Sequence, residues 1–319
     1  MASSPFLSTV VLLLLLAIRA TAATAASPTA SPGCQDRCGG VEIPYPFGIG
    51  AGCFRKGFEI GCRSSNNGSG VPVPVLATTS PSIRVLSLSV APRPEARVLL
   101  PVAWQCFNST GDRNGSYLGD VNFNQEGVYR ISDTQNELYS TPKADPRDGA
   151  CTGLGCCHVD IPPGLTDTTM SMKADNGDWS HANQEFCPCD YAFIVEKGSY
   201  TFRASDLTTT MPLNKTMPLV LDWAIRNNGS TSSSCGVQAE NRPDGEYACL
   251  SGHSECINST NGPGYVCSCI KGFEGNPYVV DRCININECT RPEEFPCHGE
   301  CKDTEGSYDC KCAPSRLRE

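Results

Sequence analysis

The residues with the widest choice of chemistry in this sequence are its 21 cysteines and four histidines. A thiolate can act as a nucleophile beside a histidine, it can bind zinc, or it can be oxidised to a disulfide. His158 directly follows the pair Cys156-Cys157. His181 precedes Cys187 by six residues. Which chemistry applies depends on the redox compartment, because an oxidising one converts most thiols into cross-links.

The N-terminus indicates that compartment. Val10 to Ile18 is an apolar run of nine residues, and the small residues from Ala20 to Ala26 follow it. This pattern predicts a cleaved signal peptide over residues 1–26. A membrane anchor is the alternative, but nine residues fall short of the roughly 20 that span a bilayer. No second apolar run follows, so we expect no transmembrane segment in this chain.

Secretion favours disulfides over both thiolate chemistries. Cysteines that are paired in disulfides are inert as nucleophiles and as zinc ligands. The sequence also contains six Asn-x-Ser/Thr sequons, each of which could carry a glycan in the secretory pathway. Their asparagines are Asn67, Asn108, Asn114, Asn214, Asn228 and Asn258. The predicted product is a secreted, disulfide-rich glycoprotein.

Motifs for enzymatic chemistry are missing from the sequence. It has no Gly-x-Ser-x-Gly elbow and no His-Glu-x-x-His zinc motif. The glycine run from Gly48 to Gly52 lacks the Lys-Ser/Thr of a nucleotide-binding loop. Paired carboxylates for glycoside hydrolysis stay open, because spacing alone does not test them. We expect a binding protein that is not an enzyme and does not bind nucleic acid.

The net charge of −9 is unevenly distributed. Residues from Cys34 to Ala103 hold seven Lys/Arg against four Asp/Glu, whereas residues from Trp104 to Glu319 hold 17 against 30. A basic first part on an acidic remainder favours contact between that first part and an anionic partner. Ordinary scatter of surface charge is the alternative.

These residues need a scaffold, and the patterns favour β-strands. From Ile83 to Val90 the apolar alternation changes phase once, which predicts a β-bulge or two short strands. Tyr191, Phe193 and Val195 alternate before a turn at residues 196–199, and Tyr200 and Phe202 resume the alternation, which predicts a hairpin. No long segment has a 3.6-residue period. We therefore expect an all-β, disulfide-rich fold.

The cysteines divide the chain into modules. A Gly/Ser/Asn-rich stretch at residues 227–234 separates the ten cysteines before it from two smaller groups. The first small group contains a Cys-x-Cys followed by Gly272-Phe273-x-Gly275 in a longer final loop. This spacing resembles an epidermal-growth-factor-like (EGF-like) module at residues 235–283. The resemblance implies the pairs Cys235–Cys256, Cys249–Cys267 and Cys269–Cys283.

The next group, at residues 285–319, carries the motif with the most specific chemistry. The segment from Asn285 to Cys289 reads NINEC, and the segment from Cys301 to Cys310 fits C-x-[DN]-x4-[FY]-x-C. Both halves resemble a calcium-binding EGF-like module, which here stops before a sixth cysteine and leaves Cys312 unassigned. The resemblance implies side-chain ligands from Asn285, Glu288 and Asp303. It implies carbonyl ligands from Ile286, Thr304 and Ser307.

Calcium suits that set, because it takes six to eight oxygen ligands. Asn285 stands where these modules usually have Asp, which removes a charge and should weaken affinity. Only Ile284 separates Cys283 from Asn285, so an ion there should stiffen the joint between the third module (235–283) and the fourth (285–319). A plain module with a solvated acidic edge is the alternative.

The N-terminal cysteine group carries a longer resemblance. Cys34 opens CQDRCGGVEIPYPFGIGAGCFRKGFEIGC, and GLGCCHVDIP and LDWAI follow at residues 153–162 and 221–225. With the two EGF-like modules, these motifs resemble the extracellular region of plant wall-associated receptor kinases. The resemblance implies a galacturonan-binding module at 34–103 and a wall-associated-kinase-specific β-rich segment at 104–230. The transmembrane helix and kinase motifs of that family are missing here.

This resemblance implies pectin, the polygalacturonate of the plant cell wall, as ligand. Carboxylates are bound by Arg and Lys, and sugar rings stack on aromatic faces. Candidate ligand-binding residues are Tyr45, Phe47, Arg55, Lys56 and Arg63, with Phe54 and Phe58 interleaved. For the aromatic residues a core position is the alternative, and for Arg55 and Lys56 a solvated turn.

We therefore expect a secreted protein of the apoplast and cell wall. It would reach the plasma membrane only through a longer form or a partner with an anchor. Recognition of apoplastic peptides or receptor partners, with pectin binding incidental, is the alternative function.

Overall fold

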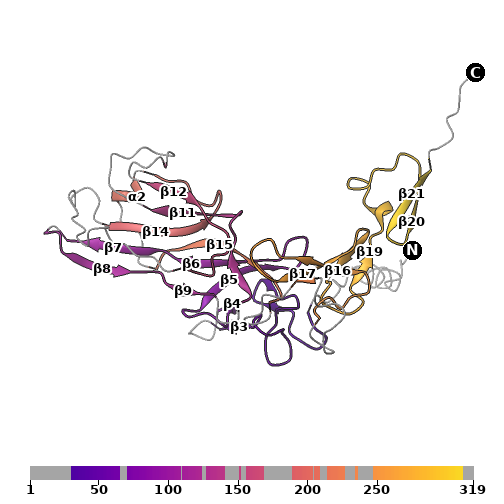
Figure 1. Cartoon of the computed structure of the whole chain (residues 1–319), viewed down its shortest axis with the longest axis horizontal. Coiled ribbons are helices and arrows are strands. Elements are labelled where there is room, and N and C mark those ends of the chain that lie inside the picture. Colours follow the sequence, from indigo (N-terminus) through magenta and orange to yellow (C-terminus); the bar gives the residue numbers. More distant parts are fainter. Residues whose placement is uncertain are drawn as a thin grey trace, which may run out of the picture.

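The structure is a computed structural model that describes residues 30–64, 70–108, 110–123, 127–140, 151, 156–168, 189–203, 205–208, 214–226, 234–235 and 247–311. The predicted signal segment and five residues named above lie outside these ranges: Asn67, His181, Cys187, Asn228 and Cys312. Within them, no helix has both the length and the apolar character needed to cross a bilayer. Figure 1 shows an elongated molecule, with two sheets at one end and the small modules extending from them.

Two antiparallel sheets form the larger part of the protein. The six-stranded sheet has the order β10-β15-β6-β5-β4-β3, and the five-stranded sheet has the order β12-β11-β14-β7-β8. The strands of the first are β3 (Ile60–Arg63), β4 (Val73–Leu76), β5 (Ile83–Ser89), β6 (Glu95–Pro101), β10 (Tyr129–Ile131) and β15 (Thr216–Trp223). Those of the second are β7 (Ala103–Phe107), β8 (Arg113–Tyr117), β11 (Asn136–Ser140), β12 (Cys157–Asp160) and β14 (Cys189–Glu196).

The remaining elements are short. Two-stranded ribbons are formed by β1 (Arg37–Cys38) with β2 (Val41–Glu42), β9 (Val121–Asn122) with β13 (Asp167–Thr168), β16 (Ser254–Asn258) with β17 (Tyr265–Cys269), β18 (Phe273–Gly275) with β19 (Cys283–Asn285), and β20 (Glu300–Thr304) with β21 (Ser307–Lys311). The described helices are α2 (Ser205–Thr208) and the 3-10 helix η1 (Glu288–Thr290). The prediction of an all-β, disulfide-rich fold is confirmed.

The sequence boundary at residues 103 and 104 does not separate two sheets. β15 pairs with β6 through seven register pairs, from Thr216 opposite Pro101 to Asp222 opposite Glu95. β10 then pairs with the other edge of β15. Strands from both sides of the boundary therefore build one sheet, and residues 34–226 are called the two-sheet unit below.

Alternating burial explains the six-stranded sheet. Along β6 the side chains of Ala96, Val98 and Leu100 are buried, and the residues between them are half-buried. A second set of buried side chains packs around Phe193 in the five-stranded sheet. The predicted bulge is confirmed, because the register of β5 against β6 shifts between Val85 and Ser87.

The hairpin predicted after Cys189 is wrong in its second half. β14 ends at Glu196 and a turn follows, but residues 200–203 form no strand. β14 pairs instead with β11 and β7, which come from distant parts of the chain. Tyr200 and Phe202 return to pack against Tyr139 and Phe193. Their alternation therefore reflects burial in the core and not strand pairing.

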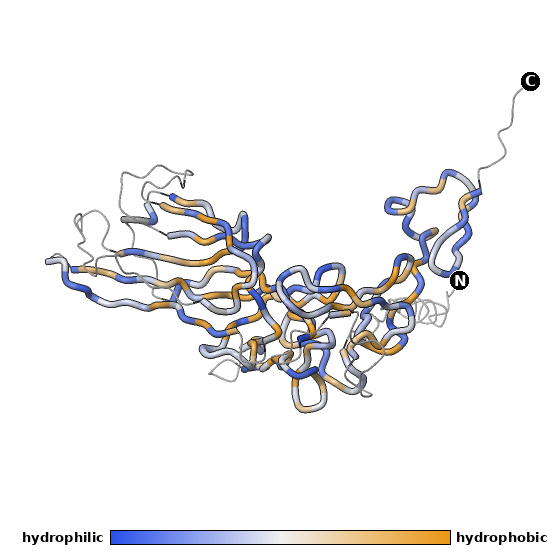
Figure 2. The backbone as a smooth tube through the Cα atoms, viewed as in Figure 1, coloured by the Kyte–Doolittle hydropathy of each residue, from blue (hydrophilic) through white to orange (hydrophobic). Residues whose placement is uncertain are grey.

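The third module is fixed to the two-sheet unit. Ile225 and Tyr265 exchange two backbone hydrogen bonds of 2.8 and 3.1 Å. These bonds join the end of the two-sheet unit to β17 of the third module. Tyr265 and Tyr278 are fully buried in the same hydrophobic cluster as Trp223. Figure 2 shows apolar segments in both sheets and in this module, and a mostly hydrophilic fourth module. The two-sheet unit and third module thus share a core.

Nine disulfides join described cysteines. The three pairs implied for the third module are all present: Cys235–Cys256, Cys249–Cys267 and Cys269–Cys283. The other pairs are Cys34–Cys53, Cys38–Cys62, Cys106–Cys189, Cys151–Cys156, Cys289–Cys301 and Cys297–Cys310. Among the described cysteines, Cys157 alone has no disulfide.

Candidate functional site

The fourth module has almost no hydrophobic core. Beyond Cys283 no hydrophobic side chain of a described residue is buried, and the buried residue there is Glu288, at 3% exposure. Its Oε2 atom is buried without a hydrogen-bond partner, and so is Oδ1 of Asp303. A buried, unpaired carboxylate oxygen is costly unless a cation compensates it. These two orphaned oxygens fit the predicted calcium site.

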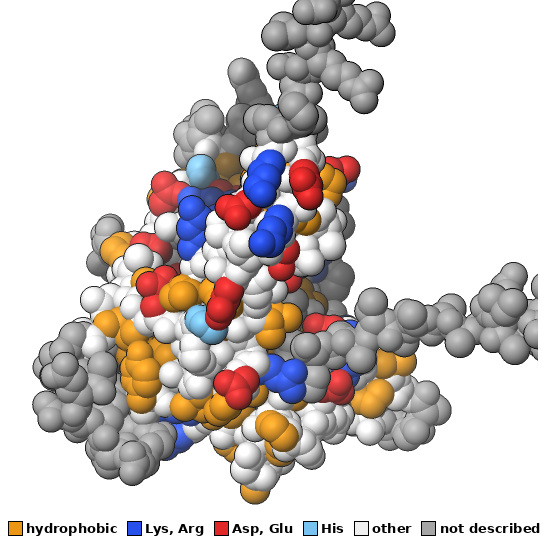
Figure 3. Space-filling view, turned by 90° about the vertical axis from the view of Figure 1, so that its right-hand side faces the viewer, with side chains coloured by type: hydrophobic (Ala, Val, Ile, Leu, Met, Phe, Trp, Pro, Cys, Tyr) orange, Lys and Arg blue, Asp and Glu red, His pale blue; other side chains and the backbone are white. Residues whose placement is uncertain are grey.

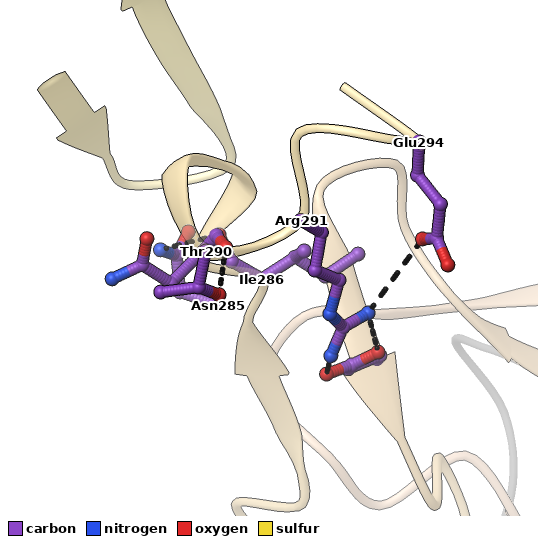
Figure 4. A network of polar contacts seen from close by, with 7 residues as sticks. Asn285, Ile286, Thr290, Arg291 and Glu294 are labelled. Atoms are coloured by element: carbon purple, nitrogen blue, oxygen red, sulfur yellow. Dashed lines mark hydrogen bonds and ion pairs between the residues drawn. The ribbon is translucent and has the colours of Figure 1, made fainter. Parts of the chain in front are cut away.

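Asn285 connects the other predicted ligands. Its Nδ2 donates to the carbonyl oxygen of Ile286 at 3.1 Å and to Oδ2 of Asp303 at 3.2 Å. Its Oδ1 accepts from the backbone N–H of Gly306. Figure 4 shows Asn285 and Ile286 beside the turn that contains Thr290. The Asn285 Nδ2 group thus lies between two oxygens that are predicted calcium ligands. A bound cation would take over these two contacts from the N–H donor.

Two further predicted ligands lie in the same ribbon. Thr304 and Ser307 close the β20–β21 turn, and the Thr304 hydroxyl donates to the Ser307 carbonyl oxygen at 2.8 Å. Hydrogen bonds thus join Asn285 to Ile286 and Asp303, and a separate one joins Thr304 to Ser307. Among the described residues no three His, Cys, Asp or Glu side chains cluster as metal ligands. A set of two carboxylates with amide and carbonyl oxygens suits a hard cation and not zinc.

Protein contacts close the same joint. Arg291 donates through both terminal guanidinium nitrogens to the Glu274 carboxylate in β18, one bond measuring 2.7 Å. Figure 4 shows this clasp, together with the weaker contact to Glu294. The Ile286 N–H donates to the Gly272 carbonyl oxygen at 2.9 Å. The third and fourth modules therefore meet through direct contacts as well as at the calcium ligands.

The charge on the fourth module is mixed. Figure 3 looks at the end formed by the small modules and shows Lys/Arg and Asp/Glu side chains side by side over its upper part. Exposed residues of both signs occur along the ribbon: Glu300, Lys302, Glu305, Asp309 and Lys311. This surface lacks the single sign of charge that would attract a polyanion.

The structure corrects one candidate ligand residue for pectin. Phe47 is 0% exposed and packs edge-to-face on Phe58 and Trp223, at centroid distances of 5.2 and 5.3 Å. It belongs to the core, so it does not offer a platform for sugar rings. Tyr45 is half-buried, and its carbonyl oxygen accepts from Nδ2 of Asn276 in the third module at 2.7 Å.

The basic candidates lie in a turn before β3 and at the end of that strand. Arg55 is half-buried near Tyr278. Burial raises the pKa of the Tyr278 hydroxyl, and the positive charge of Arg55 opposes that rise. Lys56 is exposed in the following turn. Arg63 is exposed at the end of β3, opposite Val73 in β4. Arg63 is paired with Val73, which lines a groove of about 390 Å³ among the described residues.

That groove contains a residue that sequence reasoning missed. It is lined by Gly40, Val41, Val71, Pro72, Val73, Pro74, Arg84, Val85 and Leu86. Arg84 is exposed, although its neighbours Ile83 and Val85 are buried. A basic residue facing outward between two core positions of a strand is the signal that could have identified it.

The first Cys–His arrangement is explained by a disulfide and by strand geometry. Cys156 is paired with Cys151. Cys157 and His158 are successive residues of β12, so their side chains point to opposite faces of the sheet. His158 instead lies 3.3 Å from Oε2 of Glu137 and stacks on Tyr139. The second arrangement, His181 and Cys187, lies outside the described residues.

Four of the six sequon asparagines are described, and all four are exposed: Asn108, Asn114, Asn214 and Asn258. Asn108 Oδ1 accepts from the backbone N–H groups of Thr110 and Asp112 at 3.0 and 2.8 Å. The turn therefore hydrogen-bonds the oxygen of the Asn108 side-chain amide, and these two bonds do not involve its nitrogen. The sites remain predictions, and their exposure suits attached glycans.

Comparisons with known proteins agree with this architecture. Residues 34–97 match the family described as wall-associated receptor kinase galacturonan-binding. Wall-associated receptor kinases 2 and 5 of Arabidopsis thaliana are 31% and 30% identical to the chain, over 90% and 88% of its length. The chain spans only 39% and 38% of those relatives. No solved structure matches it significantly.

Proposed function

Since the chain is similar to wall-associated receptor kinases over about nine-tenths of its length, we propose that it binds pectic galacturonan outside the cell and takes part in cell-wall sensing or adhesion. It does so without catalysing a reaction on the polymer. The observation that carries the proposal is the match of residues 34–97 to a galacturonan-binding family.

The structure supports this proposal in two ways. Residues 34–97 contain β1 to β5 and the start of β6, and disulfides Cys34–Cys53 and Cys38–Cys62 cross-link their first half. The same residues include the groove with the exposed Arg84. This part of the chain also has the excess of Lys/Arg that a polymer of carboxylates requires.

A retention assay tests the proposal. The purified secreted chain is passed over immobilised polygalacturonate and over a neutral polysaccharide, and reducing ends are measured in parallel. We expect retention on polygalacturonate, little retention on the neutral matrix, and no release of reducing ends. Equal retention on both matrices would contradict galacturonan recognition, and release of reducing ends would favour a hydrolase.

We further propose that the fourth module binds calcium at the joint. Asn285, Glu288 and Asp303 would supply side-chain oxygens, and Ile286, Thr304 and Ser307 would supply carbonyl oxygens. The support is the pair of orphaned carboxylate oxygens in a module without a hydrophobic core. The ion would supply the positive charge that these oxygens need, and it would link the end of β19 to the β20–β21 ribbon.

A further inference from the structure

The groove in the N-terminal part arises where two strands of the six-stranded sheet separate. β4 pairs with β5 only through Val75 opposite Arg84 and Leu76 opposite Ile83. Before Val75, β4 continues beside β3, whereas β5 after Arg84 continues beside β6. The bulge between Val85 and Ser87 lies at this point, and a bulge bends and twists the strand that contains it. β5 therefore turns away from β4 and leaves a gap.

The β1–β2 ribbon borders this gap. Gly40 and Val41 line the groove opposite the residues of β4 and β5. Gly39 packs so closely on this side that a Cβ there would lie 2.3 Å from the Pro72 carbonyl oxygen. The Cys38–Cys62 disulfide ties the ribbon to β3. Because the ribbon is anchored in this way, the groove is a preformed feature of the fold.

The walls of the groove are apolar and one rim is strongly exposed. Val41, Val73 and Leu86 are half-buried, and Val71 is 72% exposed. Such walls suit the C–H-rich faces of a sugar ring. The volume of about 390 Å³ lies within the range of ligand pockets, roughly 300–1,000 Å³.

Two arginines give the groove its charge. Arg63 is opposite Val73 and Arg84 is opposite Val75, and residues opposite each other in antiparallel strands share a face. Both are exposed, and neither makes a hydrogen bond or ion pair with another described residue. They lie two strands apart, so their backbones are separated laterally by roughly 10 Å. Their guanidinium groups are free to bind carboxylates on one polymer.

We propose that this groove is the galacturonan subsite, with Arg84 binding one carboxylate and Arg63 binding a second carboxylate farther along the same chain. The polymer crosses β4, and Val73 and Leu86 contact the sugar rings between the two charges. All nine lining residues fall within the matched residues 34–97. This inference rests on the proposed function and names the site at which it operates.

Binding of oligogalacturonate to the full secreted chain tests the site by titration calorimetry. Arg84→Gln removes a charge-assisted contact, so we expect affinity to fall about tenfold or more. Arg63→Gln should weaken binding less, because it lies at the edge of the groove. The matched control is Arg93→Gln, an exposed arginine in the same module that does not line the groove. Its affinity should stay within about twofold of the unmodified chain.

A second pair of variants tests the site without removing an arginine. Val71→Glu places a negative charge on the rim, and Val71→Gln has the same shape without the charge. We expect the Glu variant to weaken binding up to about fivefold in low salt and the effect to vanish in high salt. The Gln variant should bind nearly as the unmodified chain does.

The outcomes separate this inference from the proposed function. If the unmodified chain binds and the Arg84 and Val71 variants bind equally well, the groove is not the subsite while galacturonan binding stands. If the unmodified chain does not bind, the proposed function itself fails. Loss of affinity in Arg93→Gln equal to that in Arg84→Gln would also overturn the site, because it would indicate non-specific charge attraction.

Discussion

Gly272 of the third module lies directly against the backbone of Gly306 in the fourth. A Cβ built on Gly272 would be 2.1 Å from the Gly306 carbonyl oxygen, and the φ of Gly272 is +87°. Gly306, with a φ of +76°, in turn faces the ring of Phe273, which would lie 3.1 Å from a Cβ there. The joint between the two modules therefore depends on two glycines that admit close backbone contact.

Gly272→Ala should open this joint while both modules stay folded, because the clash is between backbones of different modules. We expect faster proteolysis between Cys283 and Cys289, measured by limited digestion and mass spectrometry. Gly252→Ala is the matched control, since a Cβ at Gly252 meets nothing within 4 Å. Equal protection of the two variants would show that the close contact does not hold the joint.

Asp303→Asn should abolish protection of the same joint by calcium. The substitution keeps the shape of the side chain and removes one of two carboxylates with an orphaned oxygen. Digestion with and without calcium measures the effect, and Asp309→Asn, an exposed carboxylate of β21, is the control. Calcium protection that persists in Asp303→Asn would remove this residue from the site.

Asn285→Asp should tighten calcium binding. It adds a charge and removes the amide donor that now bridges Ile286 and Asp303. Since affinity in such sites rises with the number of charged ligands, we expect a gain on the order of tenfold. Calorimetric titration with calcium measures it. Unchanged or weaker affinity would mean that Asn285 is not a ligand.

Asn261→Ala should loosen the third module from the two-sheet unit. Asn261 is 2% exposed. Its Nδ2 donates to the Ile131 carbonyl oxygen at 3.0 Å and to Asp222 Oδ2 at 2.9 Å. Its Oδ1 accepts from the Gly164 N–H at 2.9 Å. Leaving these partners unsatisfied costs about 2–4 kcal/mol. Denaturant unfolding measures the loss. Glu255→Ala, on the exposed side of the module, should change stability by less than about 0.5 kcal/mol.

Asp222 should make stability depend on pH. Burial raises the pKa of its carboxyl, and hydrogen bonds from Asn261 and Ser132 oppose the shift. The folded state therefore favours the protonated carboxyl. The contribution of Asp222 to the free energy of unfolding is fully present below the pKa of the unfolded chain, about 3.9, and is lost as pH rises through the pKa of the folded protein. Asp222→Asn should flatten that part of the stability profile, measured by denaturant unfolding at a series of pH values. An unchanged profile would contradict the assignment.

Local features of the fold could be read from the sequence. The cysteine spacing of the third module implied its three disulfides through resemblance, and all three pairs are present. The phase change after Ile83 predicted a bulge or two short strands, and the structure has the bulge, since alternation of side chains follows directly from strand geometry. Of the predicted calcium ligands, Asn285 contacts Ile286 and Asp303, and the calcium site itself stays a prediction.

Long-range pairing explains what could not be read. β15 returns to pair with β6, so residues on both sides of position 103 share a sheet that no local pattern indicates. An aromatic side chain such as Phe47 is compatible with a sugar-binding surface and with a hydrophobic core. The edge-to-face contact with Trp223 places Phe47 in the core. Arg84 lines a groove only because β4 and β5 separate. That separation depends on the pairing of β4 with β3 and of β5 with β6.

Binding of galacturonan to the N-terminal part through charge is tested most directly by the salt dependence of affinity. Calorimetric titration of the unmodified chain with oligogalacturonate is compared at low and physiological ionic strength. Exposed arginines are screened by salt, so we predict clear binding in low salt that weakens as salt is added. No binding in low salt, or an affinity that salt does not change, would contradict the account.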